Sequence, residues 1–182
     1  MKKIKGGVTA AKGFEAASAA AGIKYQGRTD MALVYSQKPC EAAGTFTTNV
    51  VKAAPVKWDK KVVESNAKPQ VIVINSGIAN ACTGDAGMEC CKEVAKEVTK
   101  VLETETESVL IGSTGVIGMQ LPVEKMKDGV HLLAKEKAEG LEMGNLAAKA
   151  IMTTDTKEKE AAVTIELGGT TVTIGGMAKG SG

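Results

Sequence analysis

The sequence has few aromatic residues and no long apolar run. Phe, Trp and Tyr together make up 3% of its 182 residues, and Trp58 is the single tryptophan. The core must therefore be built from Val, Ile, Leu, Ala and Met. No apolar stretch approaches the roughly 20 residues that a helix needs to cross a bilayer, and the basic start of the chain has no apolar stretch behind it. These absences predict a cytoplasmic protein without a membrane segment.

The sequence also has no large excess of positive or negative charge. It lacks the residue spacing of a metal site and a convincing histidine general base. The 23 basic and 21 acidic residues give a net charge of +2, so we expect neither nucleic acid nor an anionic membrane as a partner. The four cysteines, Cys40, Cys82, Cys90 and Cys91, lack zinc-like spacing, and we interpret them as free thiols. At most one of the last two should face the core. We expect no metal site, and the lone His131 is interpreted as a partly buried helix residue.

What is present is the pattern of a globular α/β protein. The hydrophobic content is 43%, and residues 1–182 are long enough for one domain with a real core. Alternating strands and helices indicate a layered α/β domain with a mixed sheet, whose first and last strand pairs are antiparallel. The strands are expected at 31–36, 43–48, 71–74, 108–111, 163–167 and 171–174, and the helices from Pro55, from a cap at Asp85 through Leu102, at 122–137 and at 140–153. The run at 71–74 should be buried on both faces.

Three polar, glycine-containing loops are the candidates for a site, because α/β sheets bind ligands beyond the carboxyl ends of their strands. They cover residues 75–84, 111–118 and 152–156. In the second loop, Gly115 beside Thr114 can expose backbone N–H groups, and two converging donors would form an oxyanion hole. A plain tight turn is the alternative favoured by these residues alone. A phosphate loop is a third alternative, but its Lys-Ser/Thr ending is missing.

Two further polar residues are weaker candidates. Thr153 belongs to a hydroxyl cluster that could bind a polar substrate, although a helix end with an Asp-assisted turn explains the same residues. Lys179 is a cation in a glycine-rich stretch, suited to a carboxylate, although a solvated lysine is the commoner case. The glycine-rich residues 175–182 follow a predicted strand. They suggest either a frayed tail or a half-built site that a partner chain completes.

Eight segments, taken together and in order, resemble the ornithine acetyltransferase family, also called glutamate N-acetyltransferase or the ArgJ family. The sequence departs from the family pattern at Ile78, where Asn is usual, and at Glu158, where Pro commonly follows the Thr-Asp-Thr motif. Neither change removes a group that we would assign to catalysis. The segments are 6–14, 22–24, 43–49, 52–56, 75–84, 113–118, 150–156 and 176–182.

The resemblance implies the α chain of a self-processing enzyme with a DmpA/ArgJ-like fold. In this family a precursor cuts itself before a threonine, which becomes the first residue and the nucleophile of the β chain. Residues 1–182 would then be one α-chain domain, completed by the β chain in an α2β2 heterotetramer. Residues 175–182 would lead toward the cleavage point.

The activity implied is acetyl transfer from N-acetylornithine to glutamate in arginine biosynthesis, through an acetyl-threonine intermediate. Thr114 and Gly115 would form the oxyanion hole, and Thr153 and Lys179 would contact the substrate. No bound cofactor is implied, and the sequence leaves open whether acetyl-CoA is also a co-substrate. Two alternatives remain: a related self-processing aminopeptidase, and a non-catalytic α/β module that binds a ligand.

Overall fold

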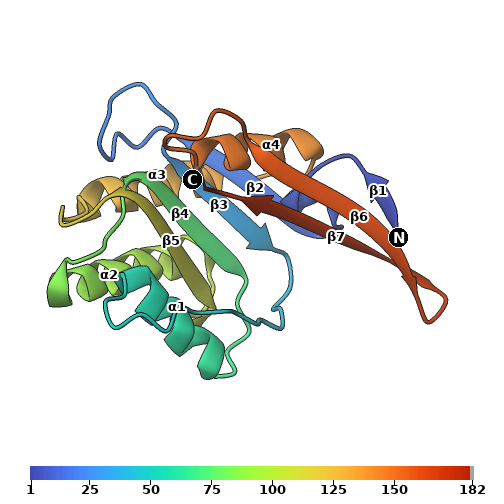
Figure 1. The fold of residues 1–182 in the computed structure, drawn as a ribbon, viewed down its shortest axis with the longest axis horizontal. Coiled ribbons are helices and arrows are strands. Elements are labelled where there is room, and N and C mark those ends of the chain that lie inside the picture. Colours follow the sequence, from blue (N-terminus) through green and yellow to red (C-terminus); the bar gives the residue numbers. More distant parts are fainter. Residues whose placement is uncertain (181–182) are drawn as a thin grey trace.

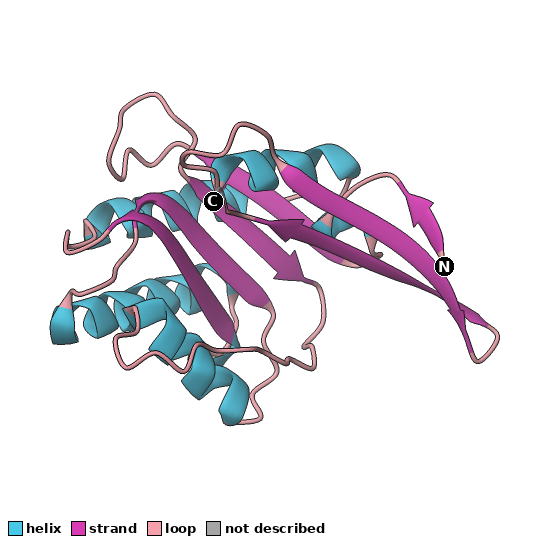
Figure 2. Ribbon diagram, in the orientation of Figure 1, coloured by secondary structure: helices cyan, strands magenta, loops and turns pink. Residues whose placement is uncertain are grey.

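The structure, a computed structural model, describes residues 1–180 and contains two sheets (Figures 1 and 2). One has the strand order β2-β3-β4-β5, antiparallel except for the parallel pair β4–β5. The other is antiparallel, with the order β1-β6-β7. The strands are β1 (Lys2–Ile4), β2 (Phe14–Ala19), β3 (Met31–Ser36), β4 (Val71–Ile78), β5 (Val109–Val116), β6 (Lys159–Leu167) and β7 (Thr170–Ala178). The helices are η1 (Val8–Ala10), α1 (Ala54–Glu64), α2 (Gly84–Leu102), η2 (Thr106–Ser108), α3 (Val123–Glu136) and α4 (Leu141–Ala150).

The four-stranded sheet is covered unequally on its two faces. Helices α1, α2 and α3 lie on one side of it and form the larger core with alternate residues of the strands. On the other side α4 packs on β2 and β3, around Ala16, Ala32 and Ala147. On the same face, Ile74 of β4 still packs against this smaller cluster, but most of β4 and β5 has no helix over it within residues 1–180, and Ile72 there is 37% exposed.

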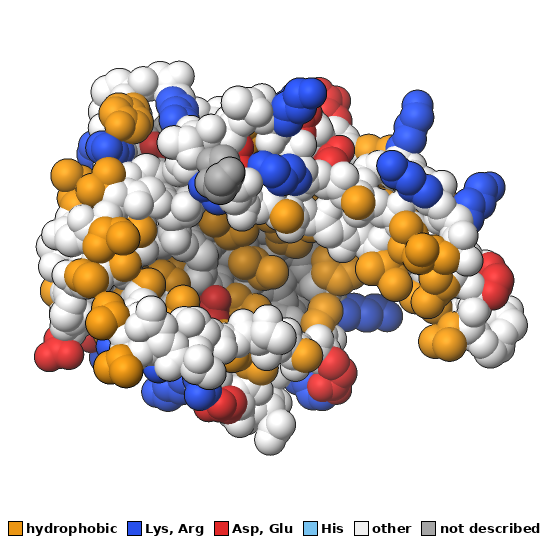
Figure 3. Space-filling model, viewed as in Figure 1, with side chains coloured by type: hydrophobic (Ala, Val, Ile, Leu, Met, Phe, Trp, Pro, Cys, Tyr) orange, Lys and Arg blue, Asp and Glu red, His pale blue; other side chains and the backbone are white. Residues whose placement is uncertain are grey.

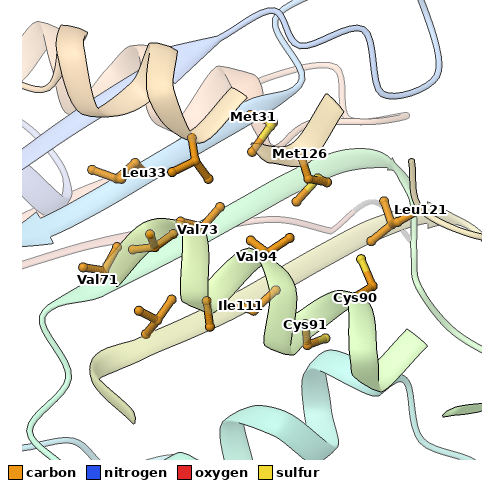
Figure 4. Packing of buried hydrophobic residues seen from close by; sticks show 14 of the residues in the cluster. Met31, Leu33, Val71, Val73, Cys90, Cys91, Val94, Ile111, Leu121 and Met126 are labelled. Carbon is orange, nitrogen blue, oxygen red and sulfur yellow. The ribbon is translucent and has the colours of Figure 1, made fainter. Parts of the chain in front are cut away.

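The larger core is aliphatic, as the composition requires. Met31 and Leu33 of β3 meet Val73 of β4, Ile111 of β5 and Met126 of α3 in one cluster (Figure 4). The strand buried on both faces is β3, because α3 and α4 pack on its opposite sides. It begins and ends where the sequence predicts.

Several elements confirm the sequence predictions in place and type. Helix α1 begins beside Pro55, α3 follows Pro122, and β6 and β7 form the hairpin around Gly168-Gly169. The layered α/β class is correct, with two sheets in place of the expected single one. Within the described part of the chain, no helix is both long and apolar enough to span a membrane.

Several local predictions are wrong. Residues 43–48 form a loop instead of a strand, since no neighbouring strand pairs with them in the described residues, and β3 pairs with β2 and β4 instead. The run at 71–74 is not buried on both faces, because no helix covers Ile72. Asp85 lies in the first turn of α2, and Thr83 holds the cap position, where its hydroxyl donates to Asn80 instead.

Another error concerns the cysteines. Both Cys90 and Cys91 are buried in the larger core, because α1 and α3 contact α2 from two directions (Figure 4). Burial raises the pKa of the Cys90 thiol to about 11 and that of Cys91 to about 12, so both remain protonated near neutral pH. All four cysteines are free, as expected.

Helix α1 covers the first half of the outer edge of β5. The Trp58 indole N–H donates to the Val109 carbonyl (2.9 Å), and the Ile111 N–H donates to Asp59 Oδ1 (2.8 Å). Two side chains of one helix therefore satisfy backbone groups that an edge strand would otherwise leave open. Burial raises the pKa of Asp59 to about 6, and the hydrogen bond from Ile111 only partly offsets this.

The raised pKa of Asp59 predicts a pH-dependent stability. Between about pH 4 and 6 the folded chain keeps a proton that the unfolded chain has released, so stability falls as the pH rises through this window. Asp59→Asn keeps an acceptor for Ile111 but carries no charge. We expect urea unfolding to show this variant about 1–3 kcal/mol more stable than wild type above pH 6.5, and nearly equal at pH 4.

The control is Asp128→Asn on the exposed side of α3, which should change stability by less than about 0.5 kcal/mol. A destabilising effect of Asp59→Asn above pH 6.5 would contradict the prediction.

Candidate active site

The candidate oxyanion residues Thr114 and Gly115 lie at the carboxyl end of β5. The backbone groups of successive residues in a strand point alternately to its two sides. Val109 and Ile111 form their hydrogen bonds with α1, on the outer side of β5. The Val116 carbonyl points to the inner side, where it accepts the N–H of Ala79, the residue that follows β4 (2.9 Å). We infer that the Gly115 N–H points away from β4, toward the outer edge of the sheet. The side chain of Thr114 lies on the face that α4 leaves uncovered.

Gly115 also lies directly against the backbone of Gly77, its partner in β4. Its φ is +137°, and a Cβ atom placed on it would lie 2.2 Å from the Gly77 carbonyl carbon and 2.6 Å from the Ile78 nitrogen. Both distances are far below van der Waals contact, so only glycine fits. Residues 111–116 of the predicted loop 111–118 therefore belong to strand β5. Glycine at position 115 allows the close pairing of the strands and also leaves its N–H exposed.

The loop 75–84 is largely a structural element. Asn75 is fully buried and donates to the Ile78 carbonyl (2.9 Å), and Asn80 donates to the Gly87 carbonyl of α2 (3.0 Å). Ile78, which departs from the family pattern, is buried in the larger core. Ser76 is the exception: it donates to the Ala150 carbonyl (2.8 Å) and thereby ties β4 to the end of α4.

The turn after α4 brings Thr153 and Lys179 together through one carboxylate. Asp155 has a side chain only 1% exposed, and it accepts hydrogen bonds from Lys159 (2.7 Å) and from the N–H groups of Thr153 (3.3 Å) and Gly180 (3.1 Å). Lys179 forms an ion pair with it (3.2 Å). The hydrogen bond from Lys159 is the main cause that holds the pKa of Asp155 well below its usual range, and the other three partners add to it. The carboxylate therefore stays charged.

One cavity of about 410 Å³ is lined by all four of the predicted site residues, Thr114, Gly115, Thr153 and Lys179. Pockets for small molecules have volumes of about 300–1,000 Å³, so this cavity has the size of a small-molecule site. The space-filling view shows this face of the molecule hollowed between the two sheets (Figure 3). The predicted residues come from the end of β5, the turn after α4 and the segment after β7, and only the fold places them together.

Sequence reasoning missed three lining residues, Lys24, Tyr25 and Arg28. They belong to the loop between β2 and β3, which lacks the periodicity that identifies an element. Gly22 and Gly27, both with positive φ, are the local signal that could have marked a shaped loop there.

The other candidates lie elsewhere. His131 is on the exposed side of α3, paired with Glu97 (2.7 Å), so the expectation of partial burial is wrong. Among residues 1–180 no group of three or more His, Cys, Asp or Glu could hold a metal ion. Ser181 and Gly182, the end of the predicted glycine-rich segment, lie outside the described residues.

Comparison with known proteins gives a consistent result. The model of the ArgJ family matches residues 15–182. A protein of Gloeobacter violaceus named arginine biosynthesis bifunctional protein ArgJ is 48% identical over 98% of this chain, and one of Symbiobacterium thermophilum with the same name is 49% identical over 100%. The chain spans only 44% and 45% of the lengths of these two relatives.

Solved structures agree over nearly the whole chain. A crystal structure of arginine biosynthesis bifunctional protein ArgJ from Bacillus halodurans has a TM-score of 0.93 at 36% identity, covering 99% of this chain and 93% of that one. A structure of ornithine acetyltransferase complexed with ornithine from Mycobacterium tuberculosis has a TM-score of 0.91 at 42% identity, covering 100% and 95%.

The close approach at Gly115 predicts a large difference between two glycine substitutions. Gly115→Ala must push β4 and β5 apart, so we expect a loss of several kcal/mol of stability or no folded protein. Gly118 has a φ of +81°, but a Cβ atom placed on it would have no other atom within 4 Å, so Gly118→Ala should cost only about 1 kcal/mol. Thermal unfolding of the two variants measures the difference. Equal, small losses would show that the strands accommodate a side chain at Gly115.

Proposed function

This chain belongs to the ArgJ family, and from that premise we propose that it is the α chain of a self-processing acetyltransferase of arginine biosynthesis. The observation that carries the proposal is the single cavity lined by Thr114, Gly115, Thr153 and Lys179. The proposed reaction moves the acetyl group of N-acetylornithine to glutamate, giving ornithine and N-acetylglutamate. Residues 1–182 would form one α-chain domain.

In the proposed mechanism, the first residue of the β chain is a threonine whose hydroxyl attacks the acetyl carbonyl. Its own α-amino group accepts the hydroxyl proton. The oxyanion is held by the outward N–H of Gly115 and by the hydroxyl or N–H of Thr114. The C–N bond then breaks as the α-ammonium group of the threonine passes its proton to the leaving nitrogen, ornithine leaves with a neutral amino group, and an acetyl ester remains on the threonine.

The second half-reaction reverses these steps with another amine. The amino group of glutamate attacks the ester carbonyl, the same donors hold the oxyanion, and the threonine hydroxyl is released. Thr153 and Lys179 would hold groups that both substrates share, with Lys179 on the α-carboxylate. Asp155 keeps Lys179 in place at the cavity in the absence of substrate.

A β chain from the same precursor, in an α2β2 assembly, is the proposed partner. Both curated relatives described above are more than twice as long as this chain. Large apolar side chains lie exposed, and the hollowed face carries many such atoms (Figure 3). They include Ile72 (37% exposed), Val116 (39%), Ile174 (52%) and Leu167 (66%). A second chain that covers the bare face of β4 and β5 would bury part of this surface and close the cavity.

Two features stay predictions. The two curated relatives carry the word "bifunctional" in their names, and acetyl-CoA as a second acetyl donor stays a prediction. The cytoplasmic location also stays a prediction, and a relative from Zea mays is named as chloroplastic.

The full-length gene product tests the function directly. We expect two fragments by mass, the second beginning with threonine, and release of N-acetylglutamate from N-acetylornithine and glutamate. A self-processing aminopeptidase would form the fragments but no N-acetylglutamate. A binding module would give one intact chain without turnover. Either result would refute the proposal.

Thr114 provides the test of the oxyanion hole. Thr114→Val removes the hydroxyl but keeps the shape, so we expect kcat to fall about 10²-fold or more if the hydroxyl is the donor. Thr114→Ser is the matched control and should retain most of the rate. If both variants keep wild-type kcat, the Thr114 hydroxyl has no part in the reaction.

Lys179 should act on binding more than on chemistry. Lys179→Ala removes a charge-assisted contact worth about 1.5–3 kcal/mol, so KM should rise about 10- to 100-fold, with a smaller fall in kcat. Lys159→Ala is the control, since it removes the other lysine bound to Asp155 but does not line the cavity. Steady-state kinetics with both substrates measures the effect. An unchanged KM in Lys179→Ala contradicts this role.

A further inference from the structure

The loop between β2 and β3 places two cations at the cavity that the proposed mechanism does not use. Lys24 and Arg28 line the cavity together with Lys179, and no aspartate or glutamate is among the lining residues of the described chain. Both side chains are half-buried. A ligand that enters this cavity therefore meets three basic groups.

The loop is held at its base, so its cations have defined positions. The Asp30 carboxylate accepts the N–H groups of Ala21 (2.8 Å) and Ile23 (2.6 Å), and Lys125 donates to the Gly22 carbonyl (2.6 Å). Asp30 is itself buried. The residue that follows this anchored base is Lys24.

Each cation is also fixed individually. Lys24 lies beside Gly77 of β4, since a Cβ atom placed on Gly77 would be 3.1 Å from the Cβ atom of Lys24. The Lys24 ammonium group lies over the Tyr25 ring, 4.8 Å from the ring centroid. Arg28 donates to the carbonyl of Met152, the residue before Thr153. Only part of the five-donor guanidinium is used by that bond. Such preorganisation lowers the cost of binding a ligand.

The charges of these two residues are not compensated. Lys179 has Asp155 as its counter-ion, but neither Lys24 nor Arg28 has a carboxylate within 4 Å in the part of the chain that the structure describes. Half-buried cations without counter-ions attract an anion. The cavity thus holds one compensated cation and two uncompensated ones.

We propose that Lys24 and Arg28 form a second carboxylate subsite, which binds the side-chain carboxylate of the acyl acceptor. This rests on the proposed function, in which the two substrates share the α-carboxylate but differ at the side chain. Ornithine ends in an ammonium group, which these cations repel, and glutamate ends in a carboxylate, which they attract. The loop between β2 and β3 then selects the acceptor, whereas Lys179 binds what both substrates have in common.

The test compares glutamate with its neutral isostere glutamine as acceptors of the acetyl group. In the full-length enzyme we expect glutamate to be preferred in kcat/KM. Lys24→Met and Arg28→Gln should each reduce the glutamate/glutamine ratio about tenfold or more. Arg28→Gln keeps a side-chain N–H donor and removes the charge. Lys12→Met, on an exposed turn outside the cavity, is the control and should keep the wild-type ratio.

The outcomes separate this inference from the function on which it rests. Release of ornithine in the first half-reaction reports whether each variant is folded and active. A wild-type enzyme that transfers no acetyl group to glutamate refutes the proposed function itself. Two results overturn the subsite alone. In the first, the enzyme transfers acetyl to glutamate, and both variants keep the wild-type glutamate/glutamine ratio of kcat/KM. In the second, kcat/KM falls equally for glutamate and for glutamine.

Discussion

The parallel pairing of β4 and β5 at Gly77 and Gly115 is the constraint on which the candidate site depends. The strands approach so closely that a Cβ on Gly115 would overlap the backbone of Gly77. This pairing holds Thr114 next to Ser76, which in turn bonds to the end of α4. One hydrogen bond therefore connects the strand ends to the turn that carries Thr153. The candidate oxyanion donors and the proposed substrate contacts therefore share a rigid support, as an active site requires.

Unequal covering of the sheet gives this support an open side. Helices α1 to α3 close one face and bury an aliphatic core, whereas α4 packs mainly on β2 and β3 on the other face. The bare face of β4 and β5 adjoins the cavity. Helix α1 satisfies the edge of β5 as far as Ile111 and no further along the strand. The backbone of Gly115 lies beyond that cover, where it can act on a bound molecule.

Local patterns predicted those elements whose structure depends on their own residues. The strand at Met31–Ser36, the helix after Pro55 and the hairpin at Gly168-Gly169 have side chains that favour one conformation. The strand predicted at 43–48 failed, because β propensity has no effect without a pairing partner. The burial of Cys90 and Cys91 together was equally inaccessible, since it depends on helices that contact α2 from two sides.

By itself the sequence determined the order of the motifs, and with it the family and the four candidate residues. Only the tertiary structure decided that Thr114, Gly115, Thr153 and Lys179 share one cavity. The structure also identified features that the sequence analysis missed. Asp155 is the counter-ion of Lys179, and the loop between β2 and β3 places Lys24 and Arg28 in the wall of the same cavity. Arg28 and Met152 are 124 positions apart and Ser76 and Ala150 are 74 apart. Contacts over such separations arise from packing of the whole chain, which no local pattern of residues encodes.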